Sequence, residues 1–328
     1  MNGRGIVVIT GAAGFLGSVL CWQLNELGED RLLLVDELGA GEKWRNLVKR
    51  RYLDFLPKDE FLRRVKADAL DLPVRAVVHL GARSATTERD AGFLYENNVR
   101  YATTLCRWTL ARGARFLFAS SAATYGNGEH GFDDDSARLP VLRPRNAYAW
   151  SKHRVDQWLA MEGLLDRVAS LKFFNVFGPN EYHKGPMRSV ALQAFEQIRD
   201  AGRVKLFASH REDYADGGQL RDFVSVKDCA AVMAWLLEHP EACGIFNVGT
   251  GQARSFRDLA TAVFQAMGRE PAIDYIPMPE PLRAGYQYFT QAGMTRLRNA
   301  GYAAPFQTLE AAVTDYVQGH LLTDDWYC

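Results

Sequence analysis

Short apolar runs alternate with stretches of helical periodicity along the first part of the chain. The runs lack polar alternation, which is typical of strands buried on both faces of a parallel sheet. They are residues 6–10, 31–36, 76–80 and 115–119. Helices are predicted after the first run, ending at Gly28, and near residues 93–112. The alternation predicts an α/β fold with a doubly wound parallel sheet. Loops are predicted at residues 126–146, 178–188 and 208–222.

Composition and charge exclude several classes of protein. The 328 residues suffice for one large α/β unit or two smaller domains. Because 39 Lys and Arg balance 39 Asp and Glu, we expect no nucleic-acid or anionic-membrane partner. No apolar run approaches the length of about 18 residues that a membrane helix needs, and no secretory leader begins the chain. Five cysteines without metal-like spacing indicate a reducing compartment. We expect a cytoplasmic enzyme with no metal site.

A glycine-rich turn joins the first predicted strand to the first helix. Gly11, Gly14 and Gly17 have the spacing G-x-x-G-x-x-G. Glycines at such a turn let the backbone approach a pyrophosphate, which the helix N-terminus binds through its free N–H groups. Because the turn lies between a strand and a helix, it predicts a dinucleotide site. The alternative is a tight turn that binds nothing.

The residues after the second strand bear on the choice between NAD and NADP. Asp36 ends that strand, where a carboxylate can accept a hydrogen bond from a ribose 2′-hydroxyl and favour NAD. Lys43 and Lys58 can instead neutralise the 2′-phosphate of NADP, whereas Glu37 would repel it. The residues themselves leave both cofactors open.

Three further residues form a candidate catalytic set. Tyr148 and Lys152 have the spacing Tyr-x-x-x-Lys, which places both on one face of a helix. An ammonium and a positive nicotinamide near the phenol favour the phenolate, so we expect the pKa of Tyr148 to be lowered. Tyr148 can then transfer a proton near neutral pH. Ser121, which follows the fourth strand, can hydrogen-bond a reacting hydroxyl.

These features resemble the extended short-chain dehydrogenase/reductase family of nucleotide-sugar enzymes over nearly the whole chain. Further matching segments are residues 174–179 (FNVFGP), 221–224 (RDFV) and 246–251 (FNVGTG). The resemblance implies a Rossmann-type doubly wound sheet with a smaller α/β substrate-binding domain. It places the NAD(P)-binding domain at residues 1–175, with about 222–248 returning to it. The substrate-binding domain would then comprise residues 176–221 and 249–328.

Other segments resemble one branch of that family, the ADP-heptose 6-epimerases. Ala122 and Ala123 stand where dehydratases of the family carry an Asp-Glu pair, which favours an epimerase. The segments that match the branch are residues 81–88, 120–126, 183–191 and 285–292. The branch implies an ADP-heptose substrate, bound NADP with NAD not excluded, a homo-oligomer such as a pentamer, and a place in lipopolysaccharide inner-core biosynthesis.

The resemblance also implies what the residues do. Tyr148 and Lys184 are the two expected acid/base residues, with Ser121 and Lys152 completing the catalytic set. Expected cofactor contacts are Gly11, Gly14, Phe15, Leu16, Gly17, Asp36, Glu37, Lys43, Lys58, Leu80, Gly81, Ala82, Arg83, Ser84, Asn97, Lys152 and Val176. Expected substrate contacts are Ser121, Asn175, Pro186, Gln193, Phe207, His210, Arg221 and Tyr286.

The chain departs from the family at five places, one of which is the pair Arg143 and Arg145, in a loop before Tyr148 that is neutral in the family. Glu37 stands where Asn is frequent, Pro186 replaces a small polar residue, and Lys172 replaces Arg. The segment 209–220 is longer than the family's loop, beside the expected nucleotide contacts. Two alternatives therefore stay open: another nucleotide-sugar epimerase, such as a UDP-hexose 4-epimerase, and a non-catalytic dinucleotide-binding protein.

Overall fold

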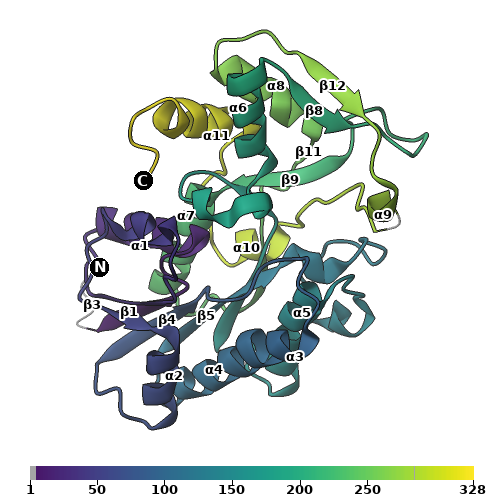
Figure 1. The fold of residues 1–328 in the computed structure, drawn as a ribbon. Helices are drawn as coiled ribbons and strands as arrows, with labels where there is room; N and C mark the ends of the chain where they lie inside the picture. Colours follow the sequence, from purple (N-terminus) through teal and green to yellow (C-terminus); the bar gives the residue numbers. More distant parts are fainter. Residues whose placement is uncertain (1–4, 284) are drawn as a thin grey trace.

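The computed structural model describes residues 5–283 and 285–328. Seven parallel strands form the main sheet in the order β10-β6-β5-β4-β1-β2-β3 (Figure 1). The chain builds outward from β1 in one direction through β2 and β3, and in the other from β4 onward, which confirms the predicted doubly wound α/β fold. The strands are β1 Ile6–Thr10, β2 Leu32–Asp36, β3 Asp54–Pro57, β4 Val74–His79, β5 Arg115–Ser121, β6 Val168–Phe173 and β10 Gly244–Val248.

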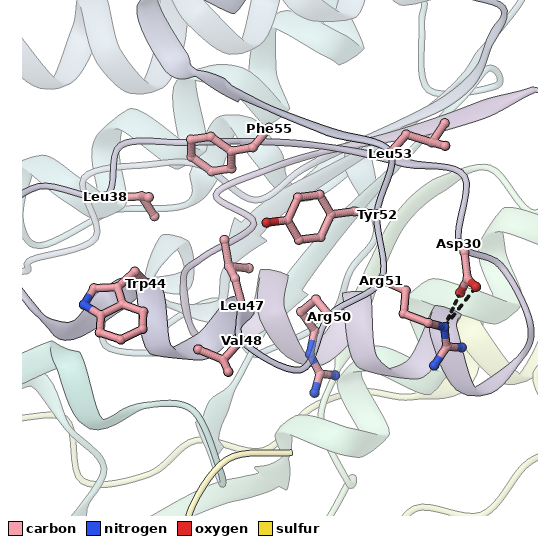
Figure 2. Close-up of a pocket in the computed structure, with 10 residues that line it drawn as sticks. All are labelled: Asp30, Leu38, Trp44, Leu47, Val48, Arg50, Arg51, Tyr52, Leu53 and Phe55. Atoms are coloured by element: carbon pink, nitrogen blue, oxygen red, sulfur yellow. Dashed lines mark hydrogen bonds and ion pairs between the residues drawn. The ribbon is translucent and has the colours of Figure 1, made fainter.

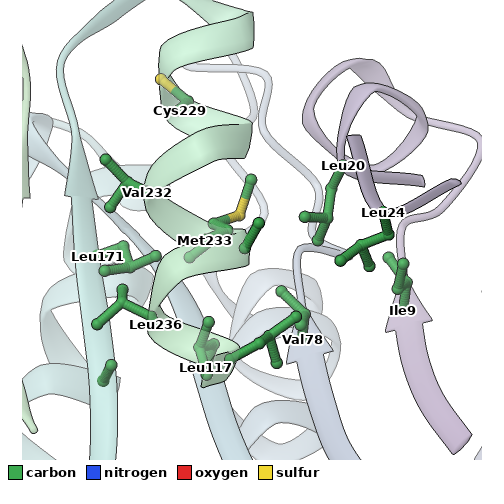
Figure 3. Close-up of a cluster of buried hydrophobic side chains, with 14 of the residues drawn as sticks. Ile9, Leu20, Leu24, Val78, Leu117, Leu171, Cys229, Val232, Met233 and Leu236 are labelled. Carbon is green, nitrogen blue, oxygen red and sulfur yellow. The ribbon is translucent and has the colours of Figure 1, made fainter. Parts of the chain in front are cut away.

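Helices cover both faces of this sheet because its strands are apolar on both sides. One face packs against α1 (Phe15–Glu26) and α7 (Val226–Glu238), where Leu24 and Met233 lie among Ile9, Val78 and Leu117 (Figure 3). The other face packs against α2 (Lys58–Lys66), α4 (Tyr101–Ala111) and α5 (Ala147–Met161). The short helices α3 (Ala91–Leu94) and α10 (Thr295–Asn299) complete this part.

A smaller part with its own apolar cluster lies at the other end of the molecule (Figure 1). A three-stranded sheet has the order β11-β9-β7, and β12 pairs with β8 in parallel. The strands are β7 Asn175–Phe177, β8 Val204–Phe207, β9 Leu220–Ser225, β11 Ala253–Ser255 and β12 Ile273–Ile276. The helices are α6 Val190–Ala201, α8 Phe256–Ala266, α9 Glu280–Arg283 and α11 Leu309–Tyr316.

Two predicted elements differ in the structure. The expected helix near residues 93–112 is divided by a π-helical turn, Tyr95–Arg100. Within it, the buried Asn98 accepts a hydrogen bond from Arg83 N (2.9 Å) and donates one to Ser151 Oγ (3.0 Å). The loop expected at 208–222 ends earlier, because β9 begins at Leu220 and pairs with β7 and β11. Both differences arise from partners distant in sequence, which local periodicity does not reveal.

We predict that Gly17→Ala destabilises the protein strongly. A Cβ atom at this position would overlap Gly11 O and lie 2.8 Å from Ala12 Cα, and both are backbone atoms in a tight turn. We expect the free energy of unfolding to fall by about 3 kcal/mol, measured by denaturant titration. Gly41→Ala is the control, because a Cβ atom there meets nothing within 4 Å. Equal stabilities of the two variants would contradict the close packing of this turn.

Candidate active site

Two adjoining cavities run along the carboxyl edge of the main sheet. Their volumes are about 520 and 410 Å³, and they share Gly11, Asp36, Lys43, Gly81, Ala82 and Arg83. Every expected cofactor contact lines one or the other, with Glu37, Lys58 and Asn97 in the smaller cavity. The larger cavity also holds all four expected catalytic residues, Ser121, Tyr148, Lys152 and Lys184.

The glycine loop forms one wall of the larger cavity. Gly11 has a φ of +69°, and a Cβ atom on it would lie 2.6 Å from Gly81 N. Gly14 is the N-cap of α1 and lacks a side chain, so the positive end of this helix opens toward the cavity. Gly11 therefore packs closely against Gly81, and the open start of α1 favours a group that carries negative charge.

Four of the five charged residues that line the smaller cavity form two ion pairs. Asp36 accepts a hydrogen bond from Ala13 N (2.8 Å) and pairs with Lys43 Nζ (2.5 Å). Lys58 Nζ lies 2.9 Å from a Glu37 carboxylate oxygen. The Lys58 ammonium lowers the pKa of the exposed Glu37. Both lysines predicted from the sequence are thus present at the cavity, each already facing a carboxylate.

Tyr148 lies in the first turn of α5, whose N-cap Asn146 accepts a hydrogen bond from Ala149 N (2.8 Å). Burial raises the pKa of Tyr148, while a hydrogen bond with Ser121 lowers it. The expectation of a lowered pKa is therefore wrong for the protein itself. Removal of water from the phenolate outweighs the hydrogen bond with Ser121.

Lys152 follows one turn after Tyr148 on α5, with its Nζ 4.7 Å from the centre of the Phe118 ring. Burial lowers the pKa of Lys152 to about 7. The negative charge of Asp156 raises this pKa, but its effect is smaller than that of burial. An amine with this pKa changes charge near neutral pH.

A buried polar network lies beneath these residues. Asp156 accepts hydrogen bonds from Ser120 Oγ and Ser170 Oγ (both 2.6 Å), and Lys172 Nζ lies 3.6 Å from it. Lys172 also donates to Thr124 Oγ1 (2.9 Å), whose hydroxyl donates to the carbonyl oxygen of Ser121 (2.8 Å). Lys172, which replaces the family's Arg, thus joins α5 to the backbone of the candidate catalytic serine.

Lys184 enters the larger cavity from the other side, in the 3₁₀ turn Tyr182–Met187. Its Nζ lies 4.9 Å from the centre of the Phe15 ring in α1. Burial lowers the pKa of Lys184, and the charge of Glu181 raises it. The neighbouring His183 has its pKa lowered to about 4 by burial, so its imidazole is neutral at pH 7.

The expected substrate contacts separate into two groups. Phe207, Arg221 and Tyr286 come together in the smaller part, with ring centres of Phe207 and Tyr286 6.3 Å apart and Arg221 5.4 Å above Tyr286. His210 joins them through Tyr288, whose hydroxyl lies 2.8 Å from His210 Nδ1. Asn175 and Pro186 are exposed, and Gln193 donates to Arg188 O (2.8 Å). Of the eight expected substrate contacts, Ser121 alone lines either of the two cavities.

Arg221 is a buried cation without a carboxylate partner in the described chain. Its side chain donates to Leu220 O (2.8 Å) and stacks on Phe256 and Tyr286. The adjacent Asp222 accepts hydrogen bonds from Thr250 N, Gly251 N and Ala292 N at 2.7–3.0 Å, which fixes the strand that carries Arg221. A desolvated guanidinium in this state is suited to an anionic ligand.

Some cavity residues were not predicted from the sequence. They are Phe173, Phe174, His183 and Met187 in the larger cavity and His79, Phe93 and Tyr101 in the smaller one. His79 Nδ1 lies 2.6 Å from Thr10 Oγ1, and burial lowers its pKa to about 3. Three of these residues could have been found from their place in the sequence. Phe173 and His79 end strands, and Phe174 follows one, at the same edge of the sheet as Ser121.

A separate apolar hollow of about 700 Å³ lies beside the edge strand β3 and shares no lining residue with the two cavities (Figure 2). Trp44 and Val48 line it, and Arg51 pairs with Asp30 at its rim. None of the expected site residues lies there. Its larger volume does not make it the candidate site, because it lacks the glycine loop and the catalytic set.

The part of the chain that the structure describes, residues 5–283 and 285–328, has neither a membrane-spanning helix nor a metal cluster. No helix of this part is long and apolar enough to cross a membrane. No cluster of three or more His, Cys, Asp or Glu side chains in it is arranged to hold a metal ion.

Sequence comparisons agree over nearly the whole chain. Residues 7–249 match the model of the NAD dependent epimerase/dehydratase family. A Nitratidesulfovibrio vulgaris (strain DP4) protein named ADP-L-glycero-D-manno-heptose-6-epimerase is 56% identical over 318 residues, covering 97% of this chain and 98% of that protein. A Fusobacterium nucleatum protein of the same name is 42% identical over 331 residues, covering 98% and 100%.

Solved structures share the fold. The Helicobacter pylori ADP-L-glycero-D-manno-heptose-6-epimerase matches with a TM-score of 0.81 at 24% identity, covering 97% of this chain and 98% of that one. The Thermus thermophilus UDP-glucose 4-epimerase, solved in complex with NAD, matches with a TM-score of 0.75 at 26% identity, covering 95% and 99%.

We predict that Lys152→Met stabilises the protein, and more at pH 6 than at pH 9. The folded-state pKa of about 7 lies below the ordinary value of 10.5, so the cost of burying the ammonium is fully present below pH 7 and is relieved above it. We expect a gain of about 2–4 kcal/mol at pH 6, from urea titrations of both proteins. A gain that is equal at both pH values would contradict a titrating Lys152.

Proposed function

The chain belongs to the NAD dependent epimerase/dehydratase family, and we propose that it interconverts ADP-D-glycero- and ADP-L-glycero-β-D-manno-heptose by inverting C6″. The observation that carries this proposal is that Tyr148 and Lys184 enter one cavity from two sides. Tyr148 projects from α5 on one face of the sheet, and Lys184 lies beside α1 on the other. Relatives of that name align over nearly their full length.

The two cavities fit a nicotinamide dinucleotide. The loop at Gly11, Gly14 and Gly17 and the start of α1 would hold its pyrophosphate, and Asp36 would face the adenosine ribose. Lys152 and Val176 line the larger cavity, where the nicotinamide end would lie. When bound, the cofactor supplies reversible oxidation at C6″, whose hydrogen is not acidic enough for inversion by deprotonation alone.

The chain's own residues move the hydroxyl proton. Tyr148, held by Ser121, takes or returns it on one side of the sugar, and Lys184 does so on the other. Two such groups are needed because the C6″ carbonyl must present its opposite face before it is reduced again. Burial favours the neutral phenol of Tyr148, which can donate a proton, and lowers the pKa of Lys184, which leaves its amine freer to accept one.

The substrate's diphosphate would bind Arg221. This buried guanidinium lacks a carboxylate partner in the described chain, and a diphosphate can accept its paired N–H groups. Phe207, Tyr286 and His210 would contact the nucleotide beside it. Asn175, Pro186 and Gln193 stay proposed contacts of the sugar end, near the turn of Lys184.

Four further parts of the proposal concern the cofactor, the domains, the assembly and the place of action. We propose NADP as the cofactor, held by Lys43 and Lys58. The residue ranges 1–175 and about 222–248 would bind it, and 176–221 and 249–328 would bind substrate. We also propose that the protein forms a homo-oligomer, such as a pentamer. It would act in the cytoplasm, in the synthesis of lipopolysaccharide precursors. All five cysteines are free thiols, as in a reducing compartment.

The deciding experiment incubates purified protein, without added cofactor, with ADP-D-glycero-β-D-manno-heptose. Proton NMR should show both C6″ epimers, and the denatured protein should release a dinucleotide that chromatography identifies. Turnover of UDP-glucose to UDP-galactose instead would favour a 4-epimerase. Reversible dinucleotide binding without turnover of either sugar would favour a non-catalytic protein.

We predict that Tyr148→Phe and Lys184→Met each lower kcat for epimerisation at least about 100-fold, because each removes one proton-transfer group. Dinucleotide affinity, measured by fluorescence titration, should change less than about threefold, since the glycine loop is intact. Lys205→Met, at an exposed lysine of β8, is the matched control and should keep full activity. Full activity of both site variants would exclude the scheme with two proton-transfer residues.

We predict that Glu37→Gln raises the affinity for NADP about five- to tenfold and leaves that for NAD within twofold. The change removes a negative charge beside the expected 2′-phosphate and releases Lys58 from its ion pair. Calorimetric titration of the dinucleotide-free protein measures both affinities. Glu162→Gln, at the far end of α5, is the control. Parallel changes for NAD and NADP would show that Glu37 does not face the 2′-position.

A further inference from the structure

A buried carboxylate, that of Glu181, has no part in the mechanism above. Glu181 is completely buried, three residues before Lys184. One carboxylate oxygen accepts hydrogen bonds from Ser189 Oγ (2.6 Å), Tyr316 Oη (3.2 Å) and Gly178 N (3.4 Å), and the other accepts one from Ser189 N. Burial raises the pKa of Glu181. The hydrogen bonds that its two oxygens accept from backbone N–H groups lower this pKa, because they favour the ionised carboxylate.

These hydrogen bonds close the turn that carries Lys184. Glu181 and Ser189 lie on either side of residues 182–188, so the contact between them joins the two ends of the turn. Lys184 N donates to Glu181 O (3.1 Å) within it. Gly185, at a φ of +55°, and Pro186 are exposed, so the turn has little packing of its own beyond that point.

The same carboxylate connects the turn to the smaller part of the molecule. Ser189 is the N-cap of α6, where its Oγ accepts a hydrogen bond from Leu192 N (3.2 Å). Tyr316 belongs to α11. Glu181 therefore joins two helices of the smaller part to a residue that acts at the cofactor cavity of the main sheet.

Glu181 is also the carboxylate whose charge acts on Lys184 within the described chain. It raises the pKa of Lys184, and Lys184 in turn lowers that of Glu181. The other titratable groups near them are His183, which is neutral at pH 7, and Tyr182 and Tyr316, whose pKa values burial raises. Lys43 and Asp36 act on His183 and pair with each other. The ring of Phe15 adds no charge from α1.

We propose that Glu181 is a positioning residue for Lys184: its hydrogen bonds to Ser189 fix the turn 182–188 at the cavity, and its negative charge acts on the lysine without a direct ion pair between the two groups. The inference rests on the proposed function only in that Lys184 transfers a proton there. The placement of the turn and the charge on Lys184 can be measured without turnover.

The first test is Glu181→Gln, which keeps the size of the side chain and removes its charge. We expect kcat to fall about 10- to 100-fold and KM to change by less than about threefold. In the pH profile of kcat, the midpoint of the step that Lys184 causes should fall by about one pH unit. Asp228→Asn is the matched control, because Asp228 is a buried carboxylate of α7 that accepts a hydrogen bond from Gln307 N (3.0 Å) and lines neither cavity. It should leave the pH profile unchanged.

The second test measures the charge of Lys184 directly. Trace acetylation by acetic anhydride across pH 6–11, followed by mass spectrometry of the Lys184 peptide, reports the titration of its amine, with the exposed Lys205 as internal reference. We expect the Lys184 midpoint to fall in Glu181→Gln and to stay unchanged in Glu181→Asp, which keeps the charge but lowers kcat. An unchanged midpoint in Glu181→Gln would overturn the proposal.

The two tests separate this proposal from the proposed function. A shifted Lys184 midpoint in a protein that does not epimerise ADP-heptose would support the coupling and reject the activity. If Glu181→Gln fails to fold by circular dichroism, Tyr316→Phe removes one hydrogen bond and keeps the charge. A wild-type kcat and midpoint in Tyr316→Phe, together with wild-type kcat in Glu181→Asp, would then overturn the positioning role.

Discussion

The geometry of the candidate site depends on the hydrogen bonds and the ion pair of one buried carboxylate, that of Asp156. Its carboxylate is completely buried, and it ties α5 to two neighbouring strands through Ser120 of β5 and Ser170 of β6. A carboxylate removed from water is stable only with such donors and a cation, which Lys172 provides. The ends of these strands carry Ser121 and Phe173, so the same contacts set Tyr148 and Lys152 above the carboxyl edge of the sheet.

The charges of the cleft follow from this arrangement. Asp156 raises the pKa of Lys152, yet burial still lowers it to about 7, while His79 and His183 are neutral at pH 7. Lys184 in the larger cavity and Arg221, which lies outside both cavities in the smaller part, are likewise desolvated. A buried cationic group favours an anionic ligand, since each new negative charge offsets a desolvation cost already present in the folded protein. A dinucleotide and a nucleotide sugar each carry a diphosphate that meets this requirement.

Local signals predicted the fold and much of the candidate site, whereas long-range contacts were not predictable. The glycine loop and the Tyr148–Lys152 pair depend on spacings within one turn or helix, and strands at the sheet edge follow from their apolar runs. Glu181 and Asp156 escaped notice because their partners lie in distant elements, as Tyr316 does. The pKa of Tyr148 was predicted in the wrong direction, because a sequence shows neighbouring charge but not the loss of water.

Two departures from the family pattern, Lys172 and Glu37, are each matched by a group of opposite charge nearby. Lys172 pairs with Asp156, and Glu37 pairs with Lys58. The long segment 209–220 folds back on itself, with Ser209 N donating to Asp216 (2.7 Å) and the ring of Tyr214 4.8 Å from that of Tyr288. Lys172 lies beneath the candidate catalytic residues, Glu37 lines the smaller cavity, and the segment 209–220 packs against Tyr288. In our scheme these changes can alter which cofactor and nucleotide bind, while Tyr148 and Lys184 keep their positions on either side of the reacting carbon.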